Sequence, residues 1–189
     1  MTRSGEFDWI ATYLAPLAAK NSFGLRDDAA LLDVPDGQSL IVTQDAIAEG
    51  IHFLPNDPLD LVARKALRVN ISDIVAKGAR PLAYSMALGV PDAWQDSDMR
   101  LFAEGLAADQ GAYGLGLTGG DTFRSPERLS VSVTMFALIG EKAYRSRLGA
   151  KPGDLIFVTG TIGNAAFGLQ VATGKLVPSA QHHEFLLNA

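Results

Sequence analysis

Apolar residues recur at helical spacing in three parts of the chain. The first part predicts a helix that Ser4 caps and that ends near residue 20. The second predicts a long helix that Pro58 opens and Gly78 closes, and the third a helix over residues 96–113. The apolar face expected for the first helix consists of Phe7, Ile10, Leu14 and Leu17.

Shorter apolar runs predict strands between these helices. Residues 39–43 are expected to form a buried strand with Asp45 at its carboxyl end, and residues 115–118 a short strand. Residues 129–135 alternate apolar and small polar side chains, which indicates a strand with one exposed face. Further strands are expected over residues 82–90, 136–140 and 155–159, and a last helix over residues 164–172.

The order of these elements is an α+β pattern, in which helices and strands alternate before several strands follow one another. Residues 21–36 are expected to be irregular. Charged and turn residues replace the core pattern over residues 141–154, as is typical of a domain junction. We therefore expect one domain over residues 1–140 and the beginning of a second over residues 141–189.

Composition excludes several classes of function. Hydrophobic residues make up 48% of the chain and charged residues 20%, which favours a folded globular protein. The formal net charge of −5 has the wrong sign for tracking nucleic acid, so no nucleic-acid partner is expected. The chain has no cysteine, which excludes disulfides and thiolate metal sites. Neither a secretory signal nor an apolar stretch of roughly 20 residues is visible, so we expect a cytoplasmic protein without a membrane partner.

The positions of the acidic residues are the most informative chemical feature. Asp28, Asp45, Asp73 and Asp121 each stand in a predicted loop, at a predicted strand end or on a helix face beside small residues. Hard cations such as Mg²⁺ prefer oxygen ligands, which carboxylates from several elements can provide together. Each aspartate taken alone also fits a simple role in a cap or turn. Spacing along the chain leaves both interpretations open.

A glycine pair precedes the last of these aspartates. Gly119 and Gly120 at a predicted strand end would let the backbone approach a phosphate closely, although the same pattern also occurs in tight turns. No Walker loop is present, because no Gly-Lys-Ser or Gly-Lys-Thr follows a glycine-rich turn. His52 and Arg145 carry side chains that can bind a phosphate, and each also fits a purely structural role.

Five segments taken together resemble the thiamine-monophosphate kinase family of the PurM-like superfamily, which includes aminoimidazole ribonucleotide synthetase. They occur in the family's order and with similar spacing over nearly the whole chain. The segments are GLRDDAAL (24–31), Asp45 with GIHF (50–53), KALRVNISDI (65–74), GGDT (119–122) and RSRLGAKPGD (145–154).

The resemblance implies a fold and a set of ligand contacts. The fold is a PurM-like amino-terminal domain with a mixed or antiparallel sheet packed against helices, followed by the start of a second α+β domain. The residues implied to bind Mg²⁺ are Asp28, Thr43, Gln44, Asp45, Asp73 and Asp121. The implied nucleotide contacts are Tyr113, Gly120, Asp121 and Arg145, and the implied substrate contact is His52.

The resemblance also implies a reaction and partners. The family uses ATP to phosphorylate thiamine monophosphate to thiamine diphosphate, the last step of thiamine diphosphate biosynthesis. Because the two phosphorylated reactants carry several negative charges, Mg²⁺ is expected to be required. The acceptor phosphate is already ionised, so we expect in-line transfer driven by positioning and charge neutralisation, without a catalytic side chain. The family's amino-terminal domains pair into a homodimer that shares a barrel.

Three departures from the family pattern leave alternatives open. Arg26 replaces a common glycine, and Gln44 stands where the family often has threonine. Full-length relatives continue beyond the position of Ala189, so this chain by itself is expected to be inactive. The alternatives are another PurM-like ATP-dependent synthetase, or a non-catalytic module for nucleotide binding and dimerisation.

Overall fold

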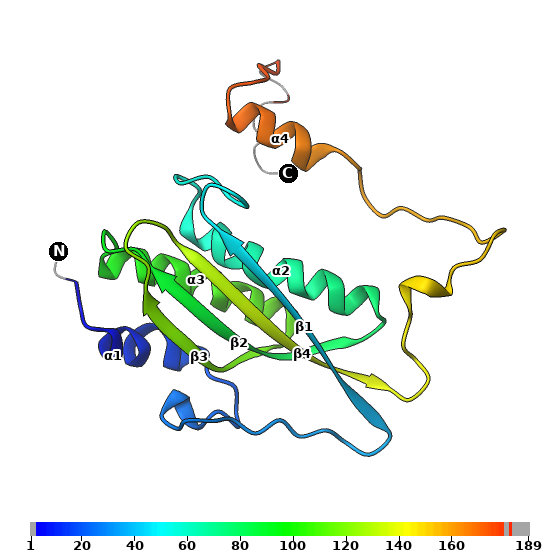
Figure 1. The fold of residues 1–189 in the computed structure, drawn as a ribbon, viewed down its shortest axis with the longest axis horizontal. Coiled ribbons are helices and arrows are strands. Elements are labelled where there is room, and N and C mark those ends of the chain that lie inside the picture. Colours follow the sequence, from blue (N-terminus) through cyan, green and yellow to red (C-terminus); the bar gives the residue numbers. More distant parts are fainter. Residues whose placement is uncertain (1–2, 180–181, 183–189) are drawn as a thin grey trace. The chain divides into compact units, whose positions relative to one another are not determined.

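Four strands form one mixed sheet in the order β1-β4-β2-β3 (Figure 1). The central strand β4 pairs antiparallel with both β1 and β2, while β2 and β3 are parallel. The strands are β1 (Gln38–Ala48), β2 (Arg80–Val90), β3 (Gly116–Arg124) and β4 (Ser130–Gly140). The computed structural model describes residues 3–179 and 182. It divides the chain into two units, Met1–Arg147, which contains the sheet, and Leu148–Ala189.

Two long helices cover one face of this sheet. They are α2 (Leu59–Ala76) and α3 (Asp96–Tyr113), which pack on each other, and both match the helices predicted from the sequence. Alternate residues of β4 point toward them, and Val133 and Met135 are fully buried in the same core as Leu67 of α2 and Phe102 of α3. Burying each such side chain contributes roughly 1.5–3 kcal/mol. The mixed sheet and its helices confirm the predicted fold class.

A buried carboxylate links the two long helices. Asp109 of α3 accepts hydrogen bonds from Arg68 Nε at 2.7 Å and from Arg64 Nε at 3.2 Å, both from α2. The hydrogen bond to Asp109 raises the pKa of Arg68. Because a buried carboxylate is costly without such partners, this contact favours one register of α3 on α2.

The first helical segment differs from its prediction. It consists of α1 (Glu6–Trp9), a π-helical turn (Ile10–Leu14) and a 3₁₀ turn (Ala15–Leu17). Pro16 has no backbone N–H to continue an α-helix, which agrees with the change of winding and the end at Leu17. None of the described helices is long and apolar enough to cross a membrane.

The predicted cap of this segment and one residue of its predicted apolar face are wrong, whereas Leu14 and Leu17 are buried and Ile10 packs against the core as expected. Ser4 does not cap the helix, because its backbone N and Oγ donate to Asp96 at 2.9 and 2.8 Å and Gly5 is the cap residue. Phe7 is 83% exposed, whereas Trp9 is buried and donates from Nε1 to Asp96 at 2.6 Å. The hydrogen bond from Trp9 lowers the pKa of Asp96 most, and the two from Ser4 lower it further.

Two predicted strands are longer in the structure, and one is absent. Asp45 lies within β1, not at its end, and Asp121 lies within β3. The strand β1 is mostly exposed, because it is an edge strand with β4 as its neighbour in the sheet. Residues 155–159 form no strand and are exposed, since an apolar run needs a pairing partner to become one. The last predicted helix is confirmed as α4 (Asn164–Ala172). Two short 3₁₀ turns complete the structure, Phe23–Leu25 and Arg147–Gly149.

The close approach of α3 to α2 can be tested with two glycines of α3. A β-carbon at Gly105 would lie 2.2 Å from the carbonyl oxygen of Asp60, whereas one at Gly111 would have no neighbour within 4 Å. We expect Gly105→Ala to lower the free energy of unfolding by about 1–3 kcal/mol through overpacking. Gly111→Ala should raise it by up to about 1 kcal/mol through helix propensity. Urea unfolding of both variants would check this, and equal effects would contradict the packing described.

Candidate functional site

The side of the sheet away from α2 and α3 carries a row of polar residues beside apolar ones such as Val42 and Phe136, and we call it the polar face. Strand pairing puts Gln44, Thr134 and Ser85 in one row across β1, β4 and β2. Gln44 Nε2 donates to Ser132 Oγ at 3.1 Å on this face. The alternating pattern of residues 129–135 therefore predicted the exposed face of β4 correctly. It gave no sign of Ser85, a polar residue in the middle of the mostly apolar strand β2.

The glycine pair lies inside β3 beside the polar face, and not at the strand end where it was expected. The pairing of β3 with β2 shifts by one residue, because Tyr84 pairs with Leu117 and Ser85 with Gly119. Gly119 and Gly120 have φ of 149° and 146°. A β-carbon at Gly120 would lie only 1.8 Å from the carbonyl oxygen of Met86. Only glycine can therefore occupy this position, where the backbone is bare of side chains.

Two aspartates flank the glycine pair. Asp28 lines a cavity of about 560 Å³ together with Ser85, Gly119 and Gly120. Asp121 lines a neighbouring cavity of about 110 Å³ that shares the same two glycines. Both carboxylates are exposed. We call Asp28, Gly119, Gly120 and Asp121 the glycine-pair group.

The other two predicted carboxylates belong to β1 and α2. Asp45 pairs with the buried Val133, so its side chain lies on the helix side of the sheet. The buried side chain of Asn70 accepts a hydrogen bond from the Asp45 backbone N at 3.1 Å and donates to the Ala66 carbonyl at 3.0 Å. Asp73 follows Asn70 three residues later on the same side of α2. We call Asp45, Asn70 and Asp73 the Asn70 group.

One chain does not bring all four carboxylates together. The row from Asp45 runs through Val133 and Met86 to Gly120, so three strand spacings separate β1 from β3. At about 4.8 Å per spacing the two backbones are roughly 14 Å apart. Among the described residues, no group of three or more His, Cys, Asp or Glu side chains could hold a metal ion. The single magnesium cluster is thus not formed within one chain.

Each group nevertheless fits the way in which Mg²⁺ is commonly bound. Mg²⁺ keeps several waters and takes one or two protein carboxylates, with substrate phosphates as further ligands. The glycine-pair group offers two exposed carboxylates beside backbone that a phosphate can approach. The Asn70 group offers two more, with Thr43 on the same face of β1 as Asp45.

His52 is held in a loop that follows β1. Its Nδ1 accepts a hydrogen bond from the Ala48 backbone N at 3.1 Å, and Lys65 of α2 donates to its carbonyl oxygen. This network assigns the proton of the neutral imidazole to Nε2, the outward donor. The sequence did not indicate the role of Lys65, because lysine on a helix is usually solvated.

The two remaining predicted residues lie elsewhere in the first unit. Tyr113 is the last residue of α3 and is 40% exposed, followed by Gly114 in a left-handed conformation. The backbone N of Arg145 donates to the carbonyl of Lys77 at 3.1 Å, which places it beside the end of α2. The structure thus brings Asp28 and Gly120 together with Asp121, but it does not place Tyr113 or Arg145 in that group.

Several known proteins are similar in sequence to this chain. A family model described as the N-terminal domain of AIR synthase related protein matches residues 26–139. The chain is 41% identical over 174 residues to a thiamine-monophosphate kinase of Caulobacter vibrioides, which covers 91% of this chain and 49% of that relative. It is 40% identical over 191 residues to a thiamine-monophosphate kinase of Escherichia coli, with 97% and 57% covered. The chain therefore spans about half the length of these relatives.

Solved structures give the same result. A crystal structure of thiamine-monophosphate kinase from Stenotrophomonas maltophilia has a TM-score of 0.79 at 34% identity, covering 95% of this chain and 57% of the other. A structure of AaThiL complexed with AMPPCP and TMP has a TM-score of 0.73 at 28% identity, covering 99% and 59%. These similarities confirm the resemblance inferred from the sequence motifs.

The anchoring of Asp45 by Asn70 can be tested by substitution. Asn70→Leu keeps a similar size but removes the acceptor for the Asp45 N–H, so we expect about 1–3 kcal/mol lower stability. Hydrogen exchange should become faster at the Asp45 amide and remain unchanged at the amides of β4. Ser72→Leu, a change at an exposed position of the same helix, is the control. Unchanged exchange at Asp45 in Asn70→Leu would contradict the anchoring role.

Proposed function

Because the chain belongs to the family of AIR synthase related proteins through its N-terminal domain, we propose that it is the metal- and nucleotide-binding half of a thiamine-phosphate kinase. In this reaction the γ-phosphoryl group of ATP is transferred to thiamine monophosphate. The observation that carries the proposal is the glycine-pair group, where bare backbone and two carboxylates line adjoining cavities. We retain residues 1–140 as the proposed extent of this domain.

Relatives support the choice of substrates. The relatives from Caulobacter vibrioides and Escherichia coli are named thiamine-monophosphate kinases, and AaThiL was solved with AMPPCP and TMP. ATP and thiamine monophosphate are therefore the substrates that we propose for this chain.

The glycine-pair group suits a polyphosphate for electrostatic reasons. Without cations, Asp28 and Asp121 would repel ATP. Mg²⁺ held by these carboxylates would supply the positive charge that offsets this repulsion. The glycines leave room for phosphate oxygens at the backbone, where a side chain would exclude them. We propose that Asp28 and Asp121 hold Mg²⁺ with the ATP phosphates.

The acceptor phosphate needs a hydrogen-bond donor that holds it in position for attack, and it needs no general base. A phosphomonoester is ionised near neutral pH, so no proton has to be removed from the attacking oxygen. The network around His52 leaves its Nε2–H to donate to that phosphate. We propose His52 as the substrate contact and Tyr113 and Arg145 as nucleotide contacts. Positioning and charge neutralisation then provide most of the rate.

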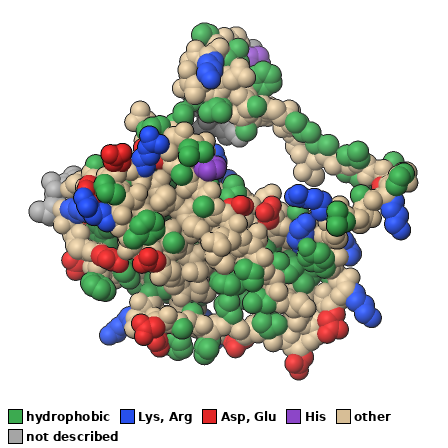
Figure 2. All heavy atoms as spheres, viewed as in Figure 1, with side chains coloured by type: hydrophobic (Ala, Val, Ile, Leu, Met, Phe, Trp, Pro, Cys, Tyr) green, Lys and Arg blue, Asp and Glu red, His purple; other side chains and the backbone are tan. Residues whose placement is uncertain are grey.

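Two copies of the chain could complete the metal site. The strands β1 and β3 are the two edges of the sheet, and β1 exposes Leu40 and Val42 on the polar face. Figure 2 shows hydrophobic side chains gathered on the face of the first unit that is turned to the viewer. Pairing of β1 of one copy with β3 of another would cover these residues and close a barrel. Asp45 of one copy would then approach Asp121 of the other, as we propose for the homodimer.

The kinase proposal can be tested with a fusion protein. Residues 1–189 joined to the remaining half of the Caulobacter vibrioides relative should form thiamine diphosphate from ATP and thiamine monophosphate, and only with Mg²⁺. Asp121→Asn should lower kcat about 100-fold or more, because phosphate charge is no longer neutralised. Liquid chromatography of the thiamine phosphates would measure this.

Asp36→Asn in the exposed turn before β1 is the matched control and should leave kcat unchanged. Mg²⁺-dependent binding of ATP by the fusion without any transfer would favour a non-catalytic module. Transfer to an amide or formyl oxygen would favour a synthetase. Either outcome would replace the kinase proposal.

The dimer can be tested by placing a charge on its proposed surface. Val42→Glu on β1 should convert a dimer into a monomer, since the carboxylate would have to be buried without a partner. Val75→Glu on α2, at a valine of similar exposure, should leave the dimer intact. Sedimentation velocity would report both masses. A dimer in Val42→Glu would show that the copies meet through another surface.

A further inference from the structure

The short helix α1 lies beside the glycine pair and lines the cavities around it (Figure 1). Its first residue, Glu6, lines the cavity of about 110 Å³ together with Asp121. The next residue, Phe7, lines the cavity of about 560 Å³ together with Asp28. Two neighbouring residues of one helical turn therefore form part of the wall of both cavities of the glycine-pair group.

The hydrophobic core does not fix the position of this helical turn. Of the four residues of α1 only Trp9 is buried, whereas Glu6 and Phe7 are both exposed. A helix of four residues is not stable by itself in water, because forming the first turn fixes several residues for a single hydrogen bond. Contacts with other parts of the molecule must therefore hold α1 beside the glycine pair.

One carboxylate of α3 binds the chain on both sides of Glu6 and Phe7. Ser4, which precedes them, donates from its backbone N and from Oγ to Asp96 at 2.9 and 2.8 Å. Trp9, which follows them, donates from Nε1 to Asp96 Oδ1 at 2.6 Å. Hydrogen bonds to an ionised acceptor are the strong ones. The contacts of Asp96 thus bracket the two residues that line the cavities.

The loop that leads into α3 also binds β3. The Asp92 carbonyl oxygen accepts a hydrogen bond from Arg3 Nη1 at 2.6 Å, and the Asp92 carboxylate accepts one from Arg124 Nε at 2.7 Å. Arg124 is the last residue of β3, the strand that contains Asp121. One short loop therefore connects the start of the chain to the strand that carries the glycine pair.

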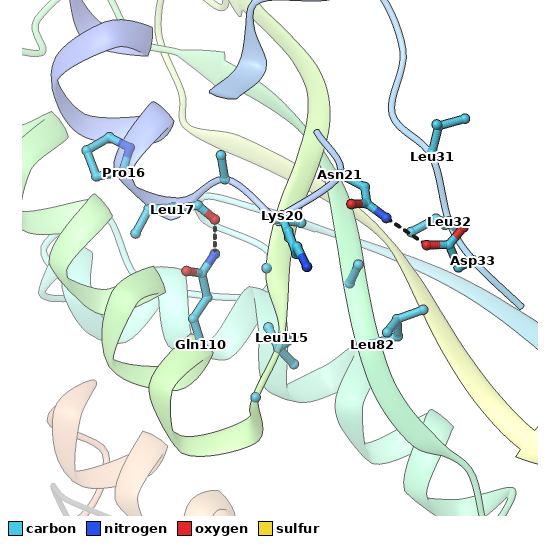
Figure 3. A pocket seen from close by; sticks show the side chains of 15 residues that line it. Pro16, Leu17, Lys20, Asn21, Leu31, Leu32, Asp33, Leu82, Gln110 and Leu115 are labelled. Carbon is cyan, nitrogen blue, oxygen red and sulfur yellow. Dashed lines mark hydrogen bonds between the residues drawn. The ribbon is translucent and has the colours of Figure 1, made fainter. Parts of the chain in front are cut away.

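The end of the first helical segment has an attachment of its own. Figure 3 shows Gln110 of α3 donating from Nε2 to the Leu17 carbonyl oxygen, at a distance of 3.0 Å. The side chains of Leu14 and Leu17 are buried in the core. Removing the Asp96 carboxylate should therefore release α1 without detaching the whole segment from the domain.

We propose that Asp96 is a positioning residue of the phosphate site, which holds α1 as a wall beside the glycine pair. The inference rests on the proposed function, which places the phosphates there. Phe7 keeps water away from one side of the phosphates, and charged groups attract one another more strongly where less water is present. Glu6 is placed to accept hydrogen bonds from the waters that Mg²⁺ retains. Asp96 itself acts only through this wall.

Calorimetry of the 189-residue chain with inorganic triphosphate and Mg²⁺ tests the role of Asp96. Asp96→Ala should weaken binding about tenfold, as is usual when a residue that orients a metal site is removed. Asp96→Asn should keep nearly the full affinity, because its Oδ1 still accepts from Trp9. The matched control is Asp98→Ala in the same turn of α3, where Asp98 accepts from the Gln95 backbone N at 2.8 Å. It should lower stability and leave the affinity unchanged.

A second readout needs no change at Asp96. The chain has no cysteine, so Phe7→Cys and Ala11→Cys each introduce a single thiol into the same segment. Triphosphate with Mg²⁺ should slow the reaction of iodoacetamide with the thiol of Phe7→Cys, because the ligand covers this part of the wall. The reaction of Ala11→Cys, at another exposed position, should keep its rate.

The outcomes separate the inference from the proposed function. If the wild type binds no triphosphate, the proposed function fails and the inference fails with it. If Asp96→Ala binds as tightly as the wild type, or Asp98→Ala loses as much affinity as Asp96→Ala, the phosphate site stands and the role of Asp96 is wrong. Equal labelling of Phe7→Cys with and without triphosphate also overturns the inference. If Asp96→Ala does not fold, Trp9→Phe, which removes only one donor to Asp96, replaces it and should weaken binding in the same direction.

Discussion

The pairing of β4 with both β1 and β2 decides where every candidate residue of this molecule lies. Because β4 is central and antiparallel to its neighbours, β1 and β3 become the two edges of the sheet. The helices α2 and α3 then cover the face that β4 fills with valines, and the small polar residues are left on the other. A shift of β4 by one residue would exchange these faces and remove both groups of carboxylates from their neighbours.

The same pairing places the two groups of predicted metal-binding carboxylates at opposite edges of the sheet. The glycine-pair group belongs to one edge and the Asn70 group to the other, and about 14 Å of sheet lies between them. Such a distance is too great for one ion to be shared by Asp45 and Asp121 of a single chain. It favours an active assembly in which each edge meets the opposite edge of another copy, which also covers an edge strand that would otherwise be open.

Much of this arrangement could be predicted from the sequence, where the signal was local. The spacing of apolar residues predicted α2 and α3, and alternation predicted the exposed face of β4. The π-helical turn after Trp9 could not be predicted, because it shifts the phase of the apolar face without any breaker residue before Pro16. The glycine pair was expected at a strand end, and only its close approach to the Met86 carbonyl explains why glycine stands inside the strand.

The candidate site was predictable as a set of residues but not as a geometry. Asp28 and Asp121 are more than 90 positions apart, and their meeting at one glycine pair depends on the path of residues 21–34 across β3. That path is fixed by Asn21, whose backbone oxygen and side-chain amide bond to Leu31 and Asp33. These contacts span ten to twelve residues of irregular chain, for which spacing gives no rule. These two contacts join the ends of the segment, and Leu25 between them packs against the core, so the Asp28 carboxylate is placed over the sheet by contacts that no local pattern announces.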